Sequence, residues 1–368
     1  LMFMQVRPDQ FEPLKDRWKE LVDTIHDAQE KPLRFLRYWV FASYDVDRLK
    51  EEDVYAWFRE NRTLVGYDKK PLVFVDRLVE AATAYAAFAQ GKDARGTPNR
   101  WLANIARLSG SARQHFILLM AGRHLAPDLF AELARQLENL LFAYVITREN
   151  TREFERAFTK WAVELRGLAD RAALDSFVGR HFVPAKAALS GRFDLTFRDL
   201  DAATLQQYRR RYVLAKLTQY VDEQGFGRGG SVPSLDAYLD KKVDLEHVLP
   251  QTLTPEVLAE FGGTAEEARA LHNRLGNLVL VEKPLNTSVG NKPFSQKRPV
   301  YPTSRYLLTR TISPPVEVGA NTSVDRAVRS FTPFQKWTKE SIAARQAMLA
   351  ALARRVWDIP DTQSAAGG

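Results

Sequence analysis

Acid, histidine and asparagine side chains occur together in one stretch of the sequence, at spacings that could serve phosphodiester hydrolysis. Asp244, Glu246 and His247 lie close together, and Asn286 follows further along the chain. A neutral imidazole accepts a proton from water near pH 7, so His247 is the natural candidate for a general base. A hard cation such as Mg²⁺ or Mn²⁺ prefers carboxylate and amide oxygens, which Glu246 and Asn286 can supply. The chain contains no cysteine, so any metal ligand must be His, Asp, Glu or Asn.

Two strands and a helix are expected to position these side chains. In an extended strand Asp244 and Glu246 point to one face and His247 to the other, so the strand must end or twist near His247. Pro250 follows, and proline cannot continue a central strand ladder. A second strand is predicted at 278–281, followed by a turn and a helix that carry the asparagine.

The segment after these strands is basic. Residues 286–316 contain lysine and arginine but no Asp or Glu. Such a run usually forms a solvated surface, but beside a metal site it is a plausible track for DNA phosphates. The residues that we predict to contact DNA are Asn291, Lys292, Lys297, Arg298 and Arg305. The arginine cluster 209–211 ahead of the motif is a further candidate for phosphate contact, with a solvated helix face as the alternative.

These features form an ordered set of motifs along the chain. The set consists of EHVLPQ at 246–251, LGNLVLV at 275–281, Asn286, SVGN at 288–291, Phe294, Lys297, Tyr301 and Ser304. It resembles the HNH nucleases, which have a ββα-metal fold. It is most similar to the C-terminal nuclease domain of GmrSD-type and SspE-type restriction proteins, which act against modified phage DNA. The resemblance covers about residues 244–304.

The resemblance implies a role for each matching residue. His247 would be the general base, Asn286 and Glu246 would hold the metal, and Asn277 would tie the ββα turn together through its amide. Many HNH enzymes have Asp at the position of Glu246, which leaves open whether Glu246 or Asp244 reaches the ion. Members of this group also carry an N-terminal nucleotide-dependent sensor domain with an Asp-Gly-Gln-Gln-Arg motif, which this sequence lacks. We therefore expect the chain to be the C-terminal part of a longer protein.

Length and composition limit the remaining possibilities. The chain has 368 residues, a size that favours two or more domains over a single core. Its net charge of +8 suits a polyanionic partner such as DNA. No apolar run reaches the ~18 residues of a membrane span. The absence of cysteine is compatible with a reducing cytosol, so we expect a cytoplasmic protein without a membrane partner.

Helical periodicity dominates the first part of the chain. One helix has a start signal in Asn150, with Glu153 in the capping-box position. The aromatic series within residues 35–41 is expected in a core rather than as a stacking platform for bases. Residues 225–230 have the spacing GxGxxG but follow a helix rather than a strand, so we interpret them as a linker and predict no nucleotide cofactor.

The predicted fold class is mainly α: a multi-helix domain, then a small ββα-metal (HNH) nuclease domain, then a C-terminal helix opened by Thr332 and Pro333. The expected parts are a helical connector at 1–224, a flexible linker at 225–240, the nuclease domain at 241–312, a loop at 313–332, a helix at 333–358 and a disordered tail at 359–368. The leading hypothesis is a metal-dependent HNH endonuclease that nicks or cleaves DNA. The alternative is a catalytically silent DNA-binding or protein-interaction module with a retained ββα fold. A weaker hypothesis makes the helical region a docking scaffold for the sensor domain.

Overall fold

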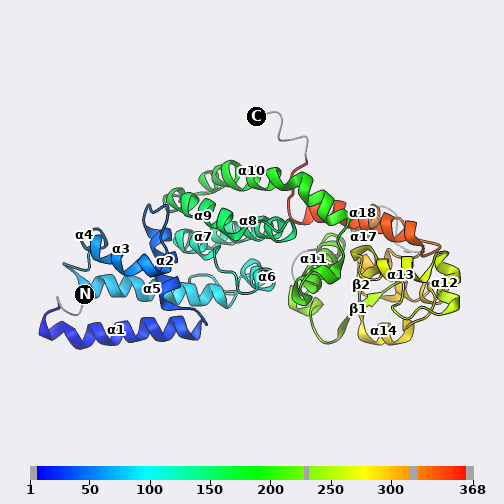
Figure 1. The fold of residues 1–368 in the computed structure, drawn as a ribbon, viewed down its shortest axis with the longest axis horizontal. Coiled ribbons are helices and arrows are strands. Elements are labelled where there is room, and N and C mark those ends of the chain that lie inside the picture. Colours follow the sequence, from blue (N-terminus) through cyan, green and yellow to red (C-terminus); the bar gives the residue numbers. More distant parts are fainter. Residues whose placement is uncertain (1–5, 228–231, 315–321, 362–368) are drawn as a thin grey trace. The chain divides into compact units, whose positions relative to one another are not determined.

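The chain divides into two compact units. The computed structural model describes residues 6–227, 232–314 and 322–361 (Figure 1). Contacts separate Leu1–Lys186 from Ala187–Gly368. In the described part of the chain no helix combines the length and the apolar character needed to cross a bilayer.

The first unit is helical. Its helices are α1 (Pro8–Asp27), α2 (Pro32–Ser43), α3 (Val54–Glu60), α4 (Arg62–Val65), α5 (Pro71–Ala89), α6 (Arg100–Ser109), α7 (Phe116–Ala121), α8 (Pro127–Ile146), α9 (Thr151–Leu165) and the first part of α10 (Arg171–Arg198). Proline stands in the first turn of α1, α2, α5 and α8, where its missing N–H costs no helical hydrogen bond. The Asn150 side chain accepts from the backbone N–H of Arg152, which confirms the predicted cap of α9.

Aromatic residues of α2 form part of the core of the first unit. Phe35, Tyr38, Trp39 and Phe41 are each at most 3% exposed. Trp39 stacks on Phe58 with the ring centroids 6.1 Å apart. The prediction that this series belongs to a core and not to a base-stacking platform is therefore confirmed.

The second unit contains a two-stranded antiparallel sheet among helices. Its elements after α10 are α11 (Gln207–Phe226), β1 (Val243–His247), α12 (Pro255–Phe261), α13 (Ala265–Leu271), β2 (Leu278–Glu282), α14 (Lys283–Val289), α15 (Phe294–Lys297), α16 (Leu307–Arg310), α17 (Ser323–Val328) and α18 (Lys339–Val356), with short 3₁₀ turns between them. Asp244 lies opposite Val281 and Glu246 lies opposite Val279. Both predicted strands are present, β1 ends at His247 as expected, and α14 follows β2 directly (Figure 1).

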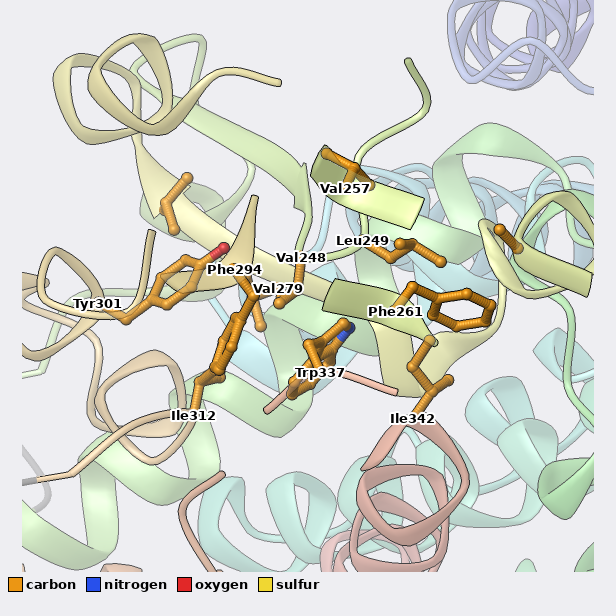
Figure 2. Packing of buried hydrophobic residues seen from close by; sticks show 12 residues of the cluster. Val248, Leu249, Val257, Phe261, Val279, Phe294, Tyr301, Ile312, Trp337 and Ile342 are labelled. Carbon is orange, nitrogen blue, oxygen red and sulfur yellow. The ribbon is translucent and has the colours of Figure 1, made fainter. Parts of the chain in front are cut away.

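A hydrophobic cluster packs around this sheet. Its members come from the loop after β1, from β2, and from several helices and the segments between them (Figure 2). Val279 of β2 is 2% exposed, and Trp337, which lies between α17 and α18, is also 2% exposed. The ring of Trp337 lies 5.3 Å from that of Phe294, measured between centroids. Residues far apart in the sequence therefore share one core beneath the sheet.

The C-terminal helix begins later than predicted. Helix α18 starts at Lys339, and its N-cap is Thr338, whose hydroxyl accepts from the backbone N–H of Ser341. Thr332 and Pro333 do not open it. The backbone N–H of Phe334 instead donates to the carbonyl of Ile312. Packing of Trp337 in the core keeps this segment out of a regular helix, so tertiary contacts override the local start signal.

Other boundaries also differ from the expected layout. Contacts group α11 with the sheet, because the division falls at Lys186 and not at 224. Within the expected linker, Leu235–Tyr238 form a 3₁₀ turn whose first and last side chains are buried, and within the expected loop α17 is helical. Ile359, placed in the expected tail, is 6% exposed. The remaining parts of these segments, 228–231, 315–321 and 362–368, lie outside the described residues.

Candidate functional site

Asn277 is the hydrogen-bonding centre of the loops beside the sheet. Its side chain is fully buried. The amide Nδ2 donates to the carbonyls of Leu249 (3.1 Å) and His272 (2.9 Å). The amide Oδ1 accepts from the backbone N–H of Leu249 (2.7 Å) and from Nε1 of Trp337 (2.9 Å). All of these partners are protein atoms, so Asn277 fixes the loop that follows β1 and does not itself face a substrate.

Helix α18 supports the turn that precedes β2. Nη1 of Arg345 donates to the carbonyls of Gly276 (2.8 Å) and Leu278 (2.9 Å). The backbone N–H of Gly276 donates to the side chain of Gln346. A Cβ at Gly276 would overlap the backbone oxygen of Ile342, so only glycine allows this close approach. The glycine of the LGN motif is therefore a packing requirement of α18.

Asp244 and Asn286 form a polar pair at the partly open side of the site. Nδ2 of Asn286 donates to Oδ2 of Asp244 at 3.1 Å. Both side chains are half-buried, and they come from β1 and α14. The structure therefore brings together two of the predicted metal ligands.

Glu246 has a different environment. It is 6% exposed, and its Oε1 lies 2.6 Å from Nζ of Lys297. The hydroxyl of Tyr301 donates to the same oxygen at 3.2 Å. Burial raises the pKa of the Glu246 carboxyl, although Lys297 and Tyr301 act in the opposite direction. This carboxylate is held in an internal ion pair, which makes Asp244 the better placed of the two acids for a metal.

His247 lies at the end of β1 among polar neighbours. Its Nε2 is 3.4 Å from Nε2 of Gln251, and its ring also interacts with the side chain of Asn273. Burial lowers the pKa of His247 to about 4, and the charges of His272, Lys297 and Arg210 lower it further, whereas Asn273 acts in the opposite direction. The imidazole is therefore neutral near pH 7, as a proton acceptor must be.

The residues predicted to contact DNA differ in how accessible they are. Lys297 is fully buried and also donates to the carbonyl of His247 at 2.8 Å. Its predicted phosphate contact is inconsistent with this position, because the ammonium is enclosed and paired with Glu246. Asn291 and Lys292 are exposed. Nζ of Lys292 donates to the carbonyl of Ser288 at 2.7 Å.

The two arginines of the predicted DNA contacts also have protein partners. Nη1 of Arg298 donates to Oε1 of Gln335 at 2.7 Å. Arg305 is exposed, and its guanidinium lies over the Tyr306 ring and 3.9 Å from a carboxylate oxygen of Glu282. Residues 286–316 contain no acid, but the fold places Glu282 of β2 beside Arg305. The spacing in the sequence did not reveal this contact.

The donor set limits the kind of metal that these residues could hold. Within the described residues no group of three or more His, Asp or Glu side chains could bind a metal ion. Asp244 offers a carboxylate oxygen, and Asn286 would offer its amide oxygen once the amide turns, because Nδ2 faces Asp244 in this structure. Mg²⁺ commonly binds one or two protein oxygens and completes its shell with water and phosphate oxygens. The pair therefore fits a hard divalent cation.

Sequence reasoning missed several residues that shape the site. Asn273 contacts His247, Arg345 holds the turn before β2, and Trp337 donates to Asn277 in that turn. Arg345 is 2% exposed, and burial lowers its pKa to about 10. Spacing could not reveal these partners, because α18 reaches the site only through tertiary packing. The sole sequence signal was Gly276, directly ahead of Asn277.

Most of this unit is similar to a known protein family. Residues 190–352 match the family described as GmrSD restriction endonucleases, C-terminal domain. This part of the chain is therefore similar to the C-terminal domain of GmrSD restriction endonucleases, the family that its motifs resemble. No curated protein matches the chain.

Proposed function

We propose that the chain is a metal-dependent HNH endonuclease that nicks or cleaves DNA, as the effector part of a restriction protein. The family match over 190–352 supports a function related to restriction endonucleases, with DNA as the substrate. The observation that carries the proposal is the arrangement of β1, β2 and α14. It supplies a neutral histidine at the end of β1 and an acid–amide pair, Asp244 and Asn286, between β1 and α14.

In the proposed reaction His247 takes a proton from the attacking water. Its pKa of about 4 keeps the ring neutral but makes it a weak base in the free protein. A DNA phosphate beside the ring would raise this pKa, because a nearby anion favours the imidazolium. Arg210 is half-buried, and its charge reaches His247, so we assign it a contact with the phosphate.

Asp244 and Asn286 would hold Mg²⁺ or Mn²⁺ through their side-chain oxygens. When bound, such an ion supplies positive charge that stabilises the phosphoryl group and the leaving oxygen. Glu246 has a supporting role in this scheme, because its carboxylate is tied to Lys297 and Tyr301. The proposal thus revises the metal ligands from Glu246 and Asn286 to Asp244 and Asn286.

Supercoiled-plasmid nicking with Mg²⁺ or Mn²⁺ tests the proposal. We expect His247→Ala to reduce the rate by about 10²- to 10⁴-fold, the usual contribution of a general base. His26→Ala is the matched control, because His26 is exposed on α1 in the first unit. Equal nicking by wild type and His247→Ala would refute the assignment of the base.

One observation favours the alternative of a silent DNA-binding module. Among the described residues the site lacks a cluster of three His or acidic ligands. DNA binding that weakens with salt, without metal-dependent cleavage in either Mg²⁺ or Mn²⁺, would support this alternative.

A further inference from the structure

The first unit contains a pocket with a volume of about 700 Å³. Volumes of this order are typical of sites that hold small ligands. The pocket is built from α2, α5 and the segments that follow α5, α7 and α9. It shares no residue with the candidate nuclease site.

The lining of this pocket is strongly basic. It includes four guanidinium groups and one carboxylate, from Arg77, Arg95, Arg123, Arg166 and Glu80. Within the described residues none of these four arginines has a carboxylate at ion-pair distance. Four positive charges against one negative charge leave a net charge of +3 in the pocket.

Two of the guanidinium groups are fixed by backbone carbonyls. Nη2 of Arg77 donates to the carbonyl of Val65 at 2.6 Å, and Nη1 of Arg123 donates to the carbonyl of Met120 at 2.7 Å. A guanidinium has five N–H donors, so each retains donors for a ligand. Burial lowers the pKa of Arg123 and of Arg166, which is the direction expected for desolvated cations.

A buried donor on the pocket wall also lacks a partner. Trp39 lines the pocket and is 2% exposed, and its Nε1 has no hydrogen-bond partner among the described residues. This nitrogen is enclosed, so the donors that a ligand can reach are those of the arginines. The ring itself is already packed against Phe58, Tyr44 and Phe74. The pocket therefore offers donors for oxygen atoms but no free ring face of Trp39 for a base.

We propose that this pocket binds a small phosphate-bearing anion with several negative charges. The planar fork of arginine matches phosphate oxygens in pairs, which makes phosphate a better partner than a compact monovalent anion. Inorganic pyrophosphate is the simplest probe, because it carries several charges and no ring.

Isothermal titration of the whole chain with pyrophosphate, at constant ionic strength, tests the proposal. We expect saturable binding of one pyrophosphate per chain. Arg95→Gln and Arg166→Gln should each weaken it by about tenfold or more, because each removes charge-assisted hydrogen bonds. Arg59→Gln is the matched control: it removes one exposed positive charge on α3 and leaves the pocket unchanged. The melting temperature of each variant without pyrophosphate verifies that the fold is retained.

Three results with pyrophosphate would overturn the proposal. They are an absence of saturable binding to the wild-type chain, unchanged affinity in both pocket variants, and equal weakening by Arg59→Gln. A short single-stranded oligonucleotide is the competing probe. If it binds more tightly than pyrophosphate and its binding depends on Arg95, the phosphate belongs to a nucleic acid and the assignment to a small anion is wrong. None of these results depends on nuclease activity, so the two proposals fail separately.

Discussion

Asp244 and Glu246 stand on the same strand and are expected on the same face, yet their surroundings are opposite. Glu246 is 6% exposed and pairs with Lys297, whose side chain is fully buried. Asp244 is half-buried and accepts a hydrogen bond from the amide of Asn286. One carboxylate is therefore neutralised by the protein, while the other keeps capacity for a ligand.

The difference shows that alternation along a strand predicts which face of the sheet a side chain is on, but not whether it binds a ligand or pairs inside the protein. A buried carboxylate needs a fixed cation or donors, because removal from water disfavours its charge. Lys297 meets that need for Glu246, and this is why Glu246 is poorly suited to recruit a metal. The partly solvated position of Asp244 lets it exchange a protein hydrogen bond for an ion.

The largest expected effect is on stability, when the buried pair is broken. Glu246→Ala should lower the free energy of unfolding by about 3–5 kcal/mol, because Lys297 is left buried without its partner. Asp244→Ala should lower it by about 1 kcal/mol or less, because only a half-exposed hydrogen bond is lost. Urea denaturation of both variants measures the two values.

A double variant shows whether the cost arises from the unpaired charge. Glu246→Leu combined with Lys297→Met replaces the pair with apolar side chains of similar length, and should recover most of the loss. If Glu246→Ala and Asp244→Ala cost the same, the contrast drawn between the two carboxylates is incorrect.

Asp222 extends the comparison to a buried carboxylate without an ion pair in the described structure. It is 4% exposed and accepts from the hydroxyl of Tyr238 and the backbone N–H of Leu307. Burial raises its pKa to about 6, against the lowering effect of these hydrogen bonds. A raised pKa means that its contribution to stability is complete below about pH 4 and is lost as the pH rises through 6.

Replacing this carboxyl should therefore remove a pH dependence. The free energy of unfolding of Asp222→Asn, minus that of wild type, should increase by about 2 kcal/mol between pH 4 and pH 7. Asp16→Asn, an exposed change on α1, is the control. A constant difference across this range would show that Asp222 does not titrate as its burial implies.

The strands were predictable from the sequence, and the partners of the acids were not. The apolar run of β2 and the proline after β1 define the strands through local chemistry alone. Lys297 lies fifty-one residues from Glu246, so their pairing depends on how α15 packs beneath the sheet. From the sequence, the position of Lys297 after the helix that carries Asn286 suggested a contact with DNA. Only its burial in the folded protein shows that it pairs with Glu246 instead.

The start of the C-terminal helix was predicted wrongly for the same reason, because tertiary contacts decide it. Thr332 and Pro333 are a sound local start signal. However, Trp337 packs in the core, and the helix begins only at Lys339.

The arginines of the pocket in the first unit come from separate helices and loops. No spacing rule groups them, since only the tertiary fold brings them to one cavity.

The next expected effect is on the proposed metal. Asp244→Asn should raise the Mn²⁺ concentration needed for half-maximal nicking by about 10- to 100-fold or more. Loss of a residue that only supports a metal ligand already has an effect of this size. The fold should be retained, because an amide can replace the carboxylate sterically. Glu246→Gln is the comparison variant, and its metal requirement should change less than that of Asp244→Asn. The reverse order would restore Glu246 as the metal ligand.

The smallest expected effect is that of mildly acidic pH on the rate of nicking. A base with an ordinary histidine pKa near 6.5 would lose about nine-tenths of its active form at pH 5.5. Because burial lowers the pKa of His247 to about 4, the unprotonated ring should still dominate there in the free protein. We expect kcat/KM for nicking to change by less than about twofold between pH 7 and pH 5.5, since this quantity reports the free enzyme. A fall in activity together with a higher Mn²⁺ requirement would point to the proposed metal site rather than to His247. A tenfold fall at saturating Mn²⁺ would instead place the titrating base in solvent and contradict the enclosed position of His247.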